Sequence, residues 1–181
     1  FRNIEFELLK CLIDAGADAR KLSNEEKILG MRRNFKTLRL LIHAGVNVNT
    51  KDKYGNSVIH YQNDLKSIKF LIDAGADVSL GKHLHPVIYY GKNIKALKSL
   101  LKAGANVNKP LDDLGYVFHE GGGGVALMNN EDPKVVKLLI DAGAKLKHAK
   151  YALHFSSNLD KRELLIKSGI PLNVRYLFKR H

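Results

Sequence analysis

The chain has 181 residues, of which 45% are hydrophobic and 27% are charged, and it carries a net charge of +12. This composition is ordinary for a folded domain, and no apolar run reaches the roughly 18 residues that a membrane-spanning helix needs. The positive charge favours an anionic partner without deciding the fold. The single cysteine excludes an intrachain disulfide, which fits a reducing compartment, and charged residues in the first ten positions argue against a secretory signal there.

A short motif recurs six times along the chain, and its best copy reads Leu71-Ile72-Asp73-Ala74-Gly75. The spacings between the glycines are 29, 30, 29, 39 and 26 residues, and these glycines are Gly16, Gly45, Gly75, Gly104, Gly143 and Gly169. A period of this size is typical of proteins built from stacked structural repeats. We therefore expect a single domain over residues 1–181 with about six units, the first and last of them partial.

The residues before each glycine predict a helix that is capped at both ends. Leu stands four residues before every glycine, Ile or Leu stands three before, and an apolar residue stands seven before except at Arg162. These offsets place the side chains on one helix face, and glycine suits the left-handed conformation that ends a helix. Asn or Asp, which are strong N-caps, stand eleven residues before five glycines, at Asn34, Asp64, Asn93, Asp132 and Asn158.

In chain order, the first helix ends near Gly16, and we expect its start to be frayed because Glu5 occupies the cap position. Cys11 is expected in the core of this helix. A capping box at 23–26 predicts a helix over 24–33, and its partner follows over 34–44. In the longest unit we expect an insertion near 113–124, a flexible glycine loop at 121–124, and a short helix over 125–131.

The loop over 46–60 carries the most specific pattern. Asp52, Gly55, Ser57 and His60 match the sequence D-x-x-G-x-T-P-L-H, with Ser in place of Thr and Val58 in place of Pro. On these residues the chain resembles ankyrin-repeat proteins over nearly its whole length. The resemblance implies an all-α solenoid of stacked helix-turn-helix repeats, linked by short β-hairpin fingers.

The same resemblance implies a non-catalytic module that binds a partner protein on its concave surface, which is made of finger tips and first helices. Tyrosines suit such a surface because they bury a large area at a low entropic cost. Carried over by position, the implied partner-binding residues are Lys51, Lys53, Tyr54, Asn56, Lys82, His83, Tyr89, Asp113 and Tyr116.

We find no pattern that predicts catalysis, a metal site or a cofactor. His83 and His85 lack a third ligand nearby in the sequence, and the glycines at 121–124 lack the Lys and Ser/Thr of a phosphate-binding loop. His60 and His154 occupy the histidine position of the family pattern. The resemblance implies for both a structural hydrogen bond between neighbouring fingers.

An alternative function follows from a row of basic residues on the second helix of each repeat, which is the helix that ends at the repeat glycine. Cations stand nine and six residues before the glycine in the four middle units, on the face opposite the Leu and Ile stripe. If the repeats stack, these cations form a basic ribbon on the convex side, which predicts binding to nucleic acid or an anionic membrane. The alternative interpretation is that the ribbon is only a solvated surface. The residues are Lys36, Arg39, Lys66, Lys69, Lys95, Lys98, Lys134 and Lys137.

Short, irregular repeats of this kind are common in the ankyrin proteins of intracellular bacteria and large DNA viruses, where they often engage host proteins. The resemblance therefore implies a cytoplasmic protein, with the host cytosol and a host partner expected if the source is of that kind.

Overall fold

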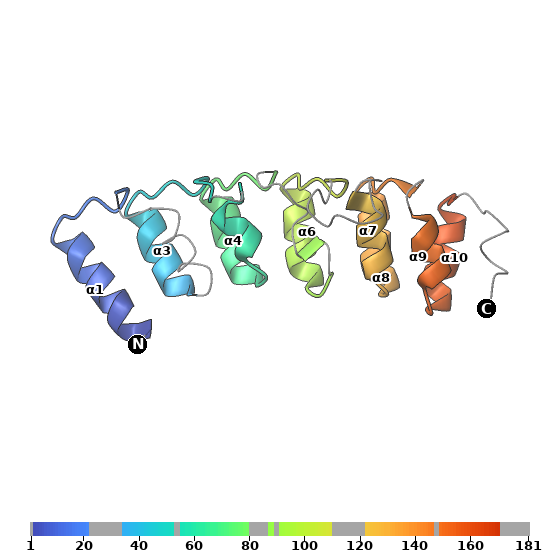
Figure 1. Ribbon diagram of the computed structural model, residues 1–181, viewed down its shortest axis with the longest axis horizontal. Coiled ribbons are helices and arrows are strands. Elements are labelled where there is room, and N and C mark those ends of the chain that lie inside the picture. Colours follow the sequence, from blue (N-terminus) through green and yellow to red (C-terminus); the bar gives the residue numbers. More distant parts are fainter. Residues whose placement is uncertain are drawn as a thin grey trace. The chain divides into compact units, whose positions relative to one another are not determined.

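The computed structural model describes residues 2–21, 34–52, 55–79, 87–88, 91–109, 122–146 and 149–170 (Figure 1). The chain separates into two compact units, residues 1–81 and 82–181. We describe each unit by itself. The predicted single domain over residues 1–181 stays a prediction.

The described part of each unit is helical. The first unit contains α1 (Arg2–Asp14), α3 (Phe35–His43), the 3-10 helix η2 (Val58–Tyr61) and α4 (Leu65–Asp73). The second unit contains α6 (Ile94–Lys102), α7 (Gly122–Asn129), α8 (Pro133–Asp141), α9 (Lys150–Phe155) and α10 (Leu159–Lys167). Within each unit the loops that follow the second helices run along the same edge (Figure 1).

Five second helices begin and end as the sequence predicts. Each predicted N-cap side chain accepts a hydrogen bond from a backbone amide in the first turn, and Pro133 occupies the first position of α8. At the other end each glycine has a φ between 84° and 90°. The amide after the glycine donates to the carbonyl of the Leu four residues before it, as Val46 does to Leu41 at 3.1 Å. The caps at both ends therefore satisfy part of the free amides and carbonyls that every short helix leaves.

The Leu and Ile stripe forms the core. The Leu four residues before the glycine is at most 4% exposed in α3, α4, α6, α8 and α10. The Ile or Leu three before it is half-buried in α3, α4, α6 and α8. The residue seven before is fully buried in those four helices, while the exception Arg162 is half-buried. Because one face of each helix is buried, stacking of neighbouring repeats supplies the apolar core.

Two predictions for the first helix are wrong. Helix α1 begins at Arg2 and passes through Glu5, because its sequence is rich in strong helix formers and needs no side-chain cap there. Cys11 is exposed rather than in the core, whereas the residue at the same position is half-buried in α3, α4, α6, α8 and α10, so the exposure comes from how little covers α1 and not from the repeat position. On this helix Leu8 and Leu12 are also 60% and 43% exposed.

The glycine run also differs from the prediction. Helix α7 starts at Gly122 and ends at Asn129, so Gly122, Gly123 and Gly124 form a helical turn instead of a flexible loop. Glycine weakens a helix by about 1 kcal/mol per position. Packing of α7 against α8 and α9, with Ala126 and Leu127 fully buried, offsets that loss. Residues 22–33 and 110–121, where we expected a helix and the start of the insertion, lie outside the described residues.

Candidate partner-binding surface

The first finger is held by a hydrogen-bonded turn. The amide of Asp52 donates to the carbonyl of Asn56 at 2.9 Å, and the amide of Gly55 donates back to the carbonyl of Asp52 at 2.9 Å. This is the tip of the expected hairpin, although no strand occurs among the residues that the structure describes. Gly55 has a φ of 74°, which explains the glycine of the D-x-x-G pattern.

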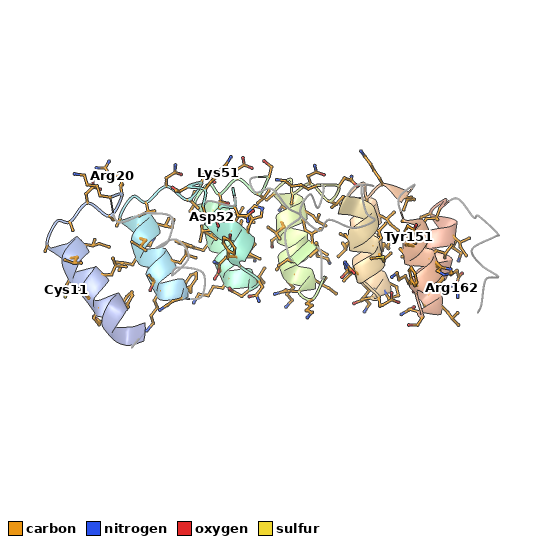
Figure 2. The ribbon with its side chains drawn as sticks, viewed as in Figure 1. Cys11, Arg20, Lys51, Asp52, Tyr151 and Arg162 are labelled. Atoms are coloured by element: carbon orange, nitrogen blue, oxygen red, sulfur yellow. The ribbon has the colours of Figure 1, made fainter. Side chains whose placement is uncertain are left out.

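The Asp52 side chain fixes this turn to the helix that follows. It is only 5% exposed, its Oδ1 accepts from the Asn56 amide at 3.0 Å, and its Oδ2 accepts from the hydroxyl of Tyr61 in η2. Asn56 also donates its Nδ2 to the Tyr61 hydroxyl at 3.4 Å. Lys51, the residue before this buried carboxylate, is exposed (Figure 2). The turn therefore presents Lys51 from a fixed backbone.

Asparagine side chains connect successive loops within each unit. Asn49 donates to the carbonyl of Gly75 at 3.1 Å and accepts from the amide of Asp77 at 2.8 Å. Asn108 repeats the arrangement in the second unit, since it donates to Gly143 O and accepts from the Lys145 amide, both at 2.8 Å. Sequence reasoning missed this link. Its signal was an Asn four residues after the repeat glycine at both positions.

Two of the predicted partner-binding residues are described. Lys51 is exposed, and Asn56 is half-buried with its amide directed to Tyr61. The other seven lie outside the described residues, so their placement stays a prediction: Lys53, Tyr54, Lys82, His83, Tyr89, Asp113 and Tyr116.

The two histidines of the family pattern differ. His60 is 5% exposed and its Nδ1 lies 3.5 Å from Ser57 Oγ, which agrees with a structural role. His154 is exposed in α9, and its ring packs edge-on against Phe155 with centroids 4.9 Å apart. The structural hydrogen bond expected for His154 is therefore wrong, because the side chain faces solvent at the end of a short helix.

The eight cations of the predicted ribbon are all exposed. Lys137 pairs with Asp141 at 3.4 Å, and Lys66 lies 4.3 Å from the centre of the Phe35 ring. The row changes sign in the last helix, where Asp160 and Glu163 occupy the equivalent positions of α10.

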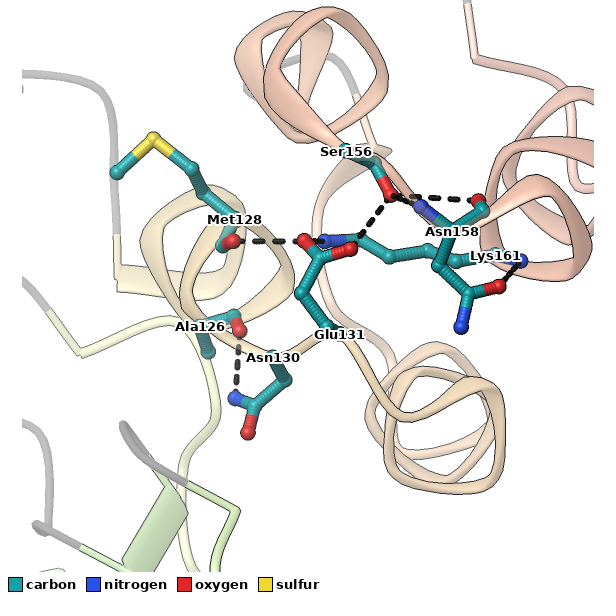
Figure 3. A network of polar contacts seen from close by, with 7 residues as sticks. All are labelled: Ala126, Met128, Asn130, Glu131, Ser156, Asn158 and Lys161. Atoms are coloured by element: carbon teal, nitrogen blue, oxygen red, sulfur yellow. Dashed lines mark hydrogen bonds and ion pairs between the residues drawn. The ribbon is translucent and has the colours of Figure 1, made fainter.

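A buried lysine in α10 was not anticipated from the sequence. Lys161 is fully buried, and its Nζ contacts Glu131 Oε1 at 2.6 Å and the carbonyl of Met128 at 3.4 Å (Figure 3). Ser156 donates to the other carboxylate oxygen at 2.8 Å. Burial alone would raise the pKa of Glu131, but the hydrogen bonds from Lys161 and Ser156 outweigh it and lower this pKa below its usual value.

This cluster has a structural explanation. It joins the loop before α8 to the loop before α10, and so ties two repeats together. Among the described residues no group of three His, Cys, Asp or Glu side chains could hold a metal ion. In that same part of the chain, no helix has the length and apolar character needed to cross a bilayer.

No protein-family model matches the chain, and no curated protein matches it. Among solved structures it is similar to an ankyrin repeat domain from Acinetobacter baumannii, with a TM-score of 0.71 and 25% sequence identity. The similarity covers 93% of this chain and 94% of that domain. Together with the capped helix repeats, this match shows that the chain has the ankyrin-repeat fold, an all-α solenoid, and it supports an ankyrin-repeat protein. Domains of this fold are generally non-catalytic modules for protein–protein interaction.

Proposed function

We propose that this protein binds a partner protein through the surface formed by its finger tips and first helices. The observation that supports this most is the buried Asp52 side chain, which joins Asn56 to Tyr61 of η2 directly beside the exposed Lys51. Tyr54 and Tyr116, at or beside the two D-x-x-G turns, would supply the aromatic anchors of this surface.

We expect these loops to be preorganised for binding a partner. A loop that is already ordered loses little conformational entropy when a partner binds, so more of the contact energy appears as affinity. The Asn49 and Asn108 links add to this, because each fixes one loop to the next within its unit. Variation of exposed side chains on such loops then sets specificity without altering the helices beneath.

The identity of the partner and the site of action belong to the same proposal. The lone cysteine fits a cytoplasmic protein, where thiols stay reduced. The short, irregular repeats fit a protein that engages a host partner in the host cytosol, if the source is an intracellular bacterium or a large DNA virus.

The test compares two variants for the proteins they capture from cytosol. The finger variant combines Lys51→Glu, Tyr54→Ala and Tyr116→Ala. The matched control carries Lys66→Glu alone, on the exposed face of α4, and so has the same net charge. We expect a partner that wild type and control retain and the finger variant loses by at least about tenfold, a common effect of removing interface anchors. Purified partner should then bind with weak salt dependence. Equal capture by all three proteins would contradict the proposal.

A further inference from the structure

The outward face of the second helices differs in kind from the finger surface. It carries a cation nine and six residues before the glycine in α3, α4, α6 and α8, and all eight are exposed. We infer that this basic face binds the anionic surface of a lipid membrane. The inference goes beyond the proposed protein partner and uses none of the finger residues.

Most of the charges on this face have no counter-charge among the residues that the structure describes. Of the eight cations, only Lys137 has a carboxylate partner among the described residues, Asp141 at 3.4 Å. Helices α3 and α6 contain no Asp or Glu, and α4 contains only Asp73 at its last position. A surface that serves solubility alone usually intersperses both signs of charge. In α3, α4, α6 and α8 all eight of these positions carry a positive charge.

The repeat register itself does not require these cations. Helix α10 has the same Asn cap, the same buried Leu and the same terminal glycine, yet it carries Asp160 and Glu163 at the two positions. Helix α1 carries Glu7 and Lys10 there. The basic pairs are therefore confined to the middle repeats, and folding alone does not explain them.

Within each unit the basic pairs lie on the second helices of two neighbouring repeats. The rings of Phe35 in α3 and Phe70 in α4 pack edge to face with centroids 5.5 Å apart, and Lys66 lies over Phe35. In the second unit Gly91, before α6, packs against Val135 of α8, and the loops after both helices are joined through Asn108. Packed helices lie about 10 Å apart, roughly one Debye length, so neighbouring pairs repel and an anionic surface relieves that repulsion.

The side chains favour lipid over nucleic acid. Seven of the eight cations are Lys, whereas Arg is the usual residue for nucleic-acid recognition. Stacking on bases needs exposed aromatic rings, and Phe35 and Phe70 are half-buried between helices. Clusters of four to eight Lys and Arg bind anionic lipid with about a fivefold gain for each cation near the surface.

The contact is electrostatic and does not involve insertion. Large exposed apolar side chains in the described part of the chain lie on α1, α9 and α10, and none lies on α3, α4, α6 or α8. A protein held this way lies on the headgroups and dissociates as salt shortens the Debye length from about 10 Å to about 3 Å.

The test measures binding of the full chain to phosphatidylcholine vesicles with and without phosphatidylserine. One variant carries Lys66→Glu, Lys69→Glu, Lys95→Glu and Lys98→Glu. Its control carries Lys21→Glu, Lys51→Glu, Lys92→Glu and Lys145→Glu, four exposed lysines outside these helices, and has the same net charge. Circular dichroism checks that both variants stay folded.

We expect wild type and control to bind only the phosphatidylserine vesicles at about 0.1 M salt and to be released at about 1 M. The face variant should lose binding by more than about a hundredfold, given the fivefold contribution of each cation. Equal loss in the control would show a net-charge effect, and absence of wild-type binding would leave a solvated face. Tighter binding to a single-stranded oligonucleotide, lost in the same variant, would assign the face to nucleic acid. Each of these three results overturns the inference.

Discussion

Helices α8 and α10 belong to the same unit and share the same caps and the same buried Leu, yet one fully buried position holds different kinds of residue. Both have nine residues, a capping Asp or Asn, and a fully buried Leu four residues before the glycine. Eight residues before the glycine, α8 has Val135, which is 1% exposed, and α10 has Lys161, which is fully buried. One repeat position therefore accepts either an apolar side chain or a charge.

The residue before the N-cap in the preceding repeat explains whether this position holds an apolar side chain or a charged one. Lys161 pairs with Glu131, the residue directly before the N-cap of α8. The residue in the same place before the N-cap of α6 is Lys92. A buried charge requires a matched partner, because removing a charge from water costs several kcal/mol. The ion pair is therefore specific to one junction between repeats and is not a feature of every repeat.

The largest effect is expected when the lysine is moved to the helix that lacks the partner. Val135→Lys would bury a cation near Lys92 instead of a carboxylate, so the free energy of unfolding should fall by at least about 3–5 kcal/mol. Urea denaturation measures it, with Val135→Met as an uncharged control of similar length. If the two variants were equally stable, the junction would tolerate a charge without a partner.

Removal of the carboxylate from the existing pair should be the next largest change. Glu131→Ala leaves Lys161 buried without its counter-charge, which we expect to lower the free energy of unfolding by about 3 kcal/mol, at the low end for a buried pair because Glu131 is 48% exposed. Adding Lys161→Met should restore most of the loss, since an apolar chain of similar length fills the site. A double variant no more stable than Glu131→Ala would contradict this account.

Much of this fold could be predicted because its determinants are local. The N-caps, the terminal glycines and the buried Leu stripe each depend on side chains within about eleven positions, and they repeat. Lys161 could have been noticed as the one charge at a position otherwise held by Thr37, Ser67, Ala96 or Val135 in neighbouring second helices. Its pairing with Glu131, 30 residues away, has no local signal.

The proposed partner-binding surface was harder to predict for a related reason. Lys51 is exposed, but the hydrogen bond beside it joins Asp52 to Tyr61, nine residues later, and these side chains meet only after η2 has formed. Likewise the exposure of Cys11 and His154 depends on what covers the end helices, which repeat periodicity does not specify.

The pH dependence should follow the same ion pair with a smaller effect. Hydrogen bonds from Lys161 and Ser156 lower the pKa of Glu131 in the folded chain. Its stabilisation is therefore present above the unfolded-state pKa, about 4.3, and is lost as the pH falls through the lower folded-state value. In denaturation series from neutral to acidic pH, wild type should lose more stability than Glu131→Gln. Parallel curves would show that this carboxylate does not titrate with folding.

The smallest effect is expected for the exposed pair on the same helix. Glu163 and Lys167 of α10 also form an ion pair, and the hydrogen bond from Lys167 lowers the pKa of Glu163, but their side chains are 63% and 72% exposed. Water and salt screen such a pair, so Glu163→Gln should leave the urea midpoint unchanged within error and insensitive to salt. A loss comparable to that of Glu131→Ala would mean that burial is not what separates the two pairs. If the midpoint is unchanged and Glu131→Ala causes a large loss, then of these two ion pairs only the one with the buried Lys161 contributes measurably to stability.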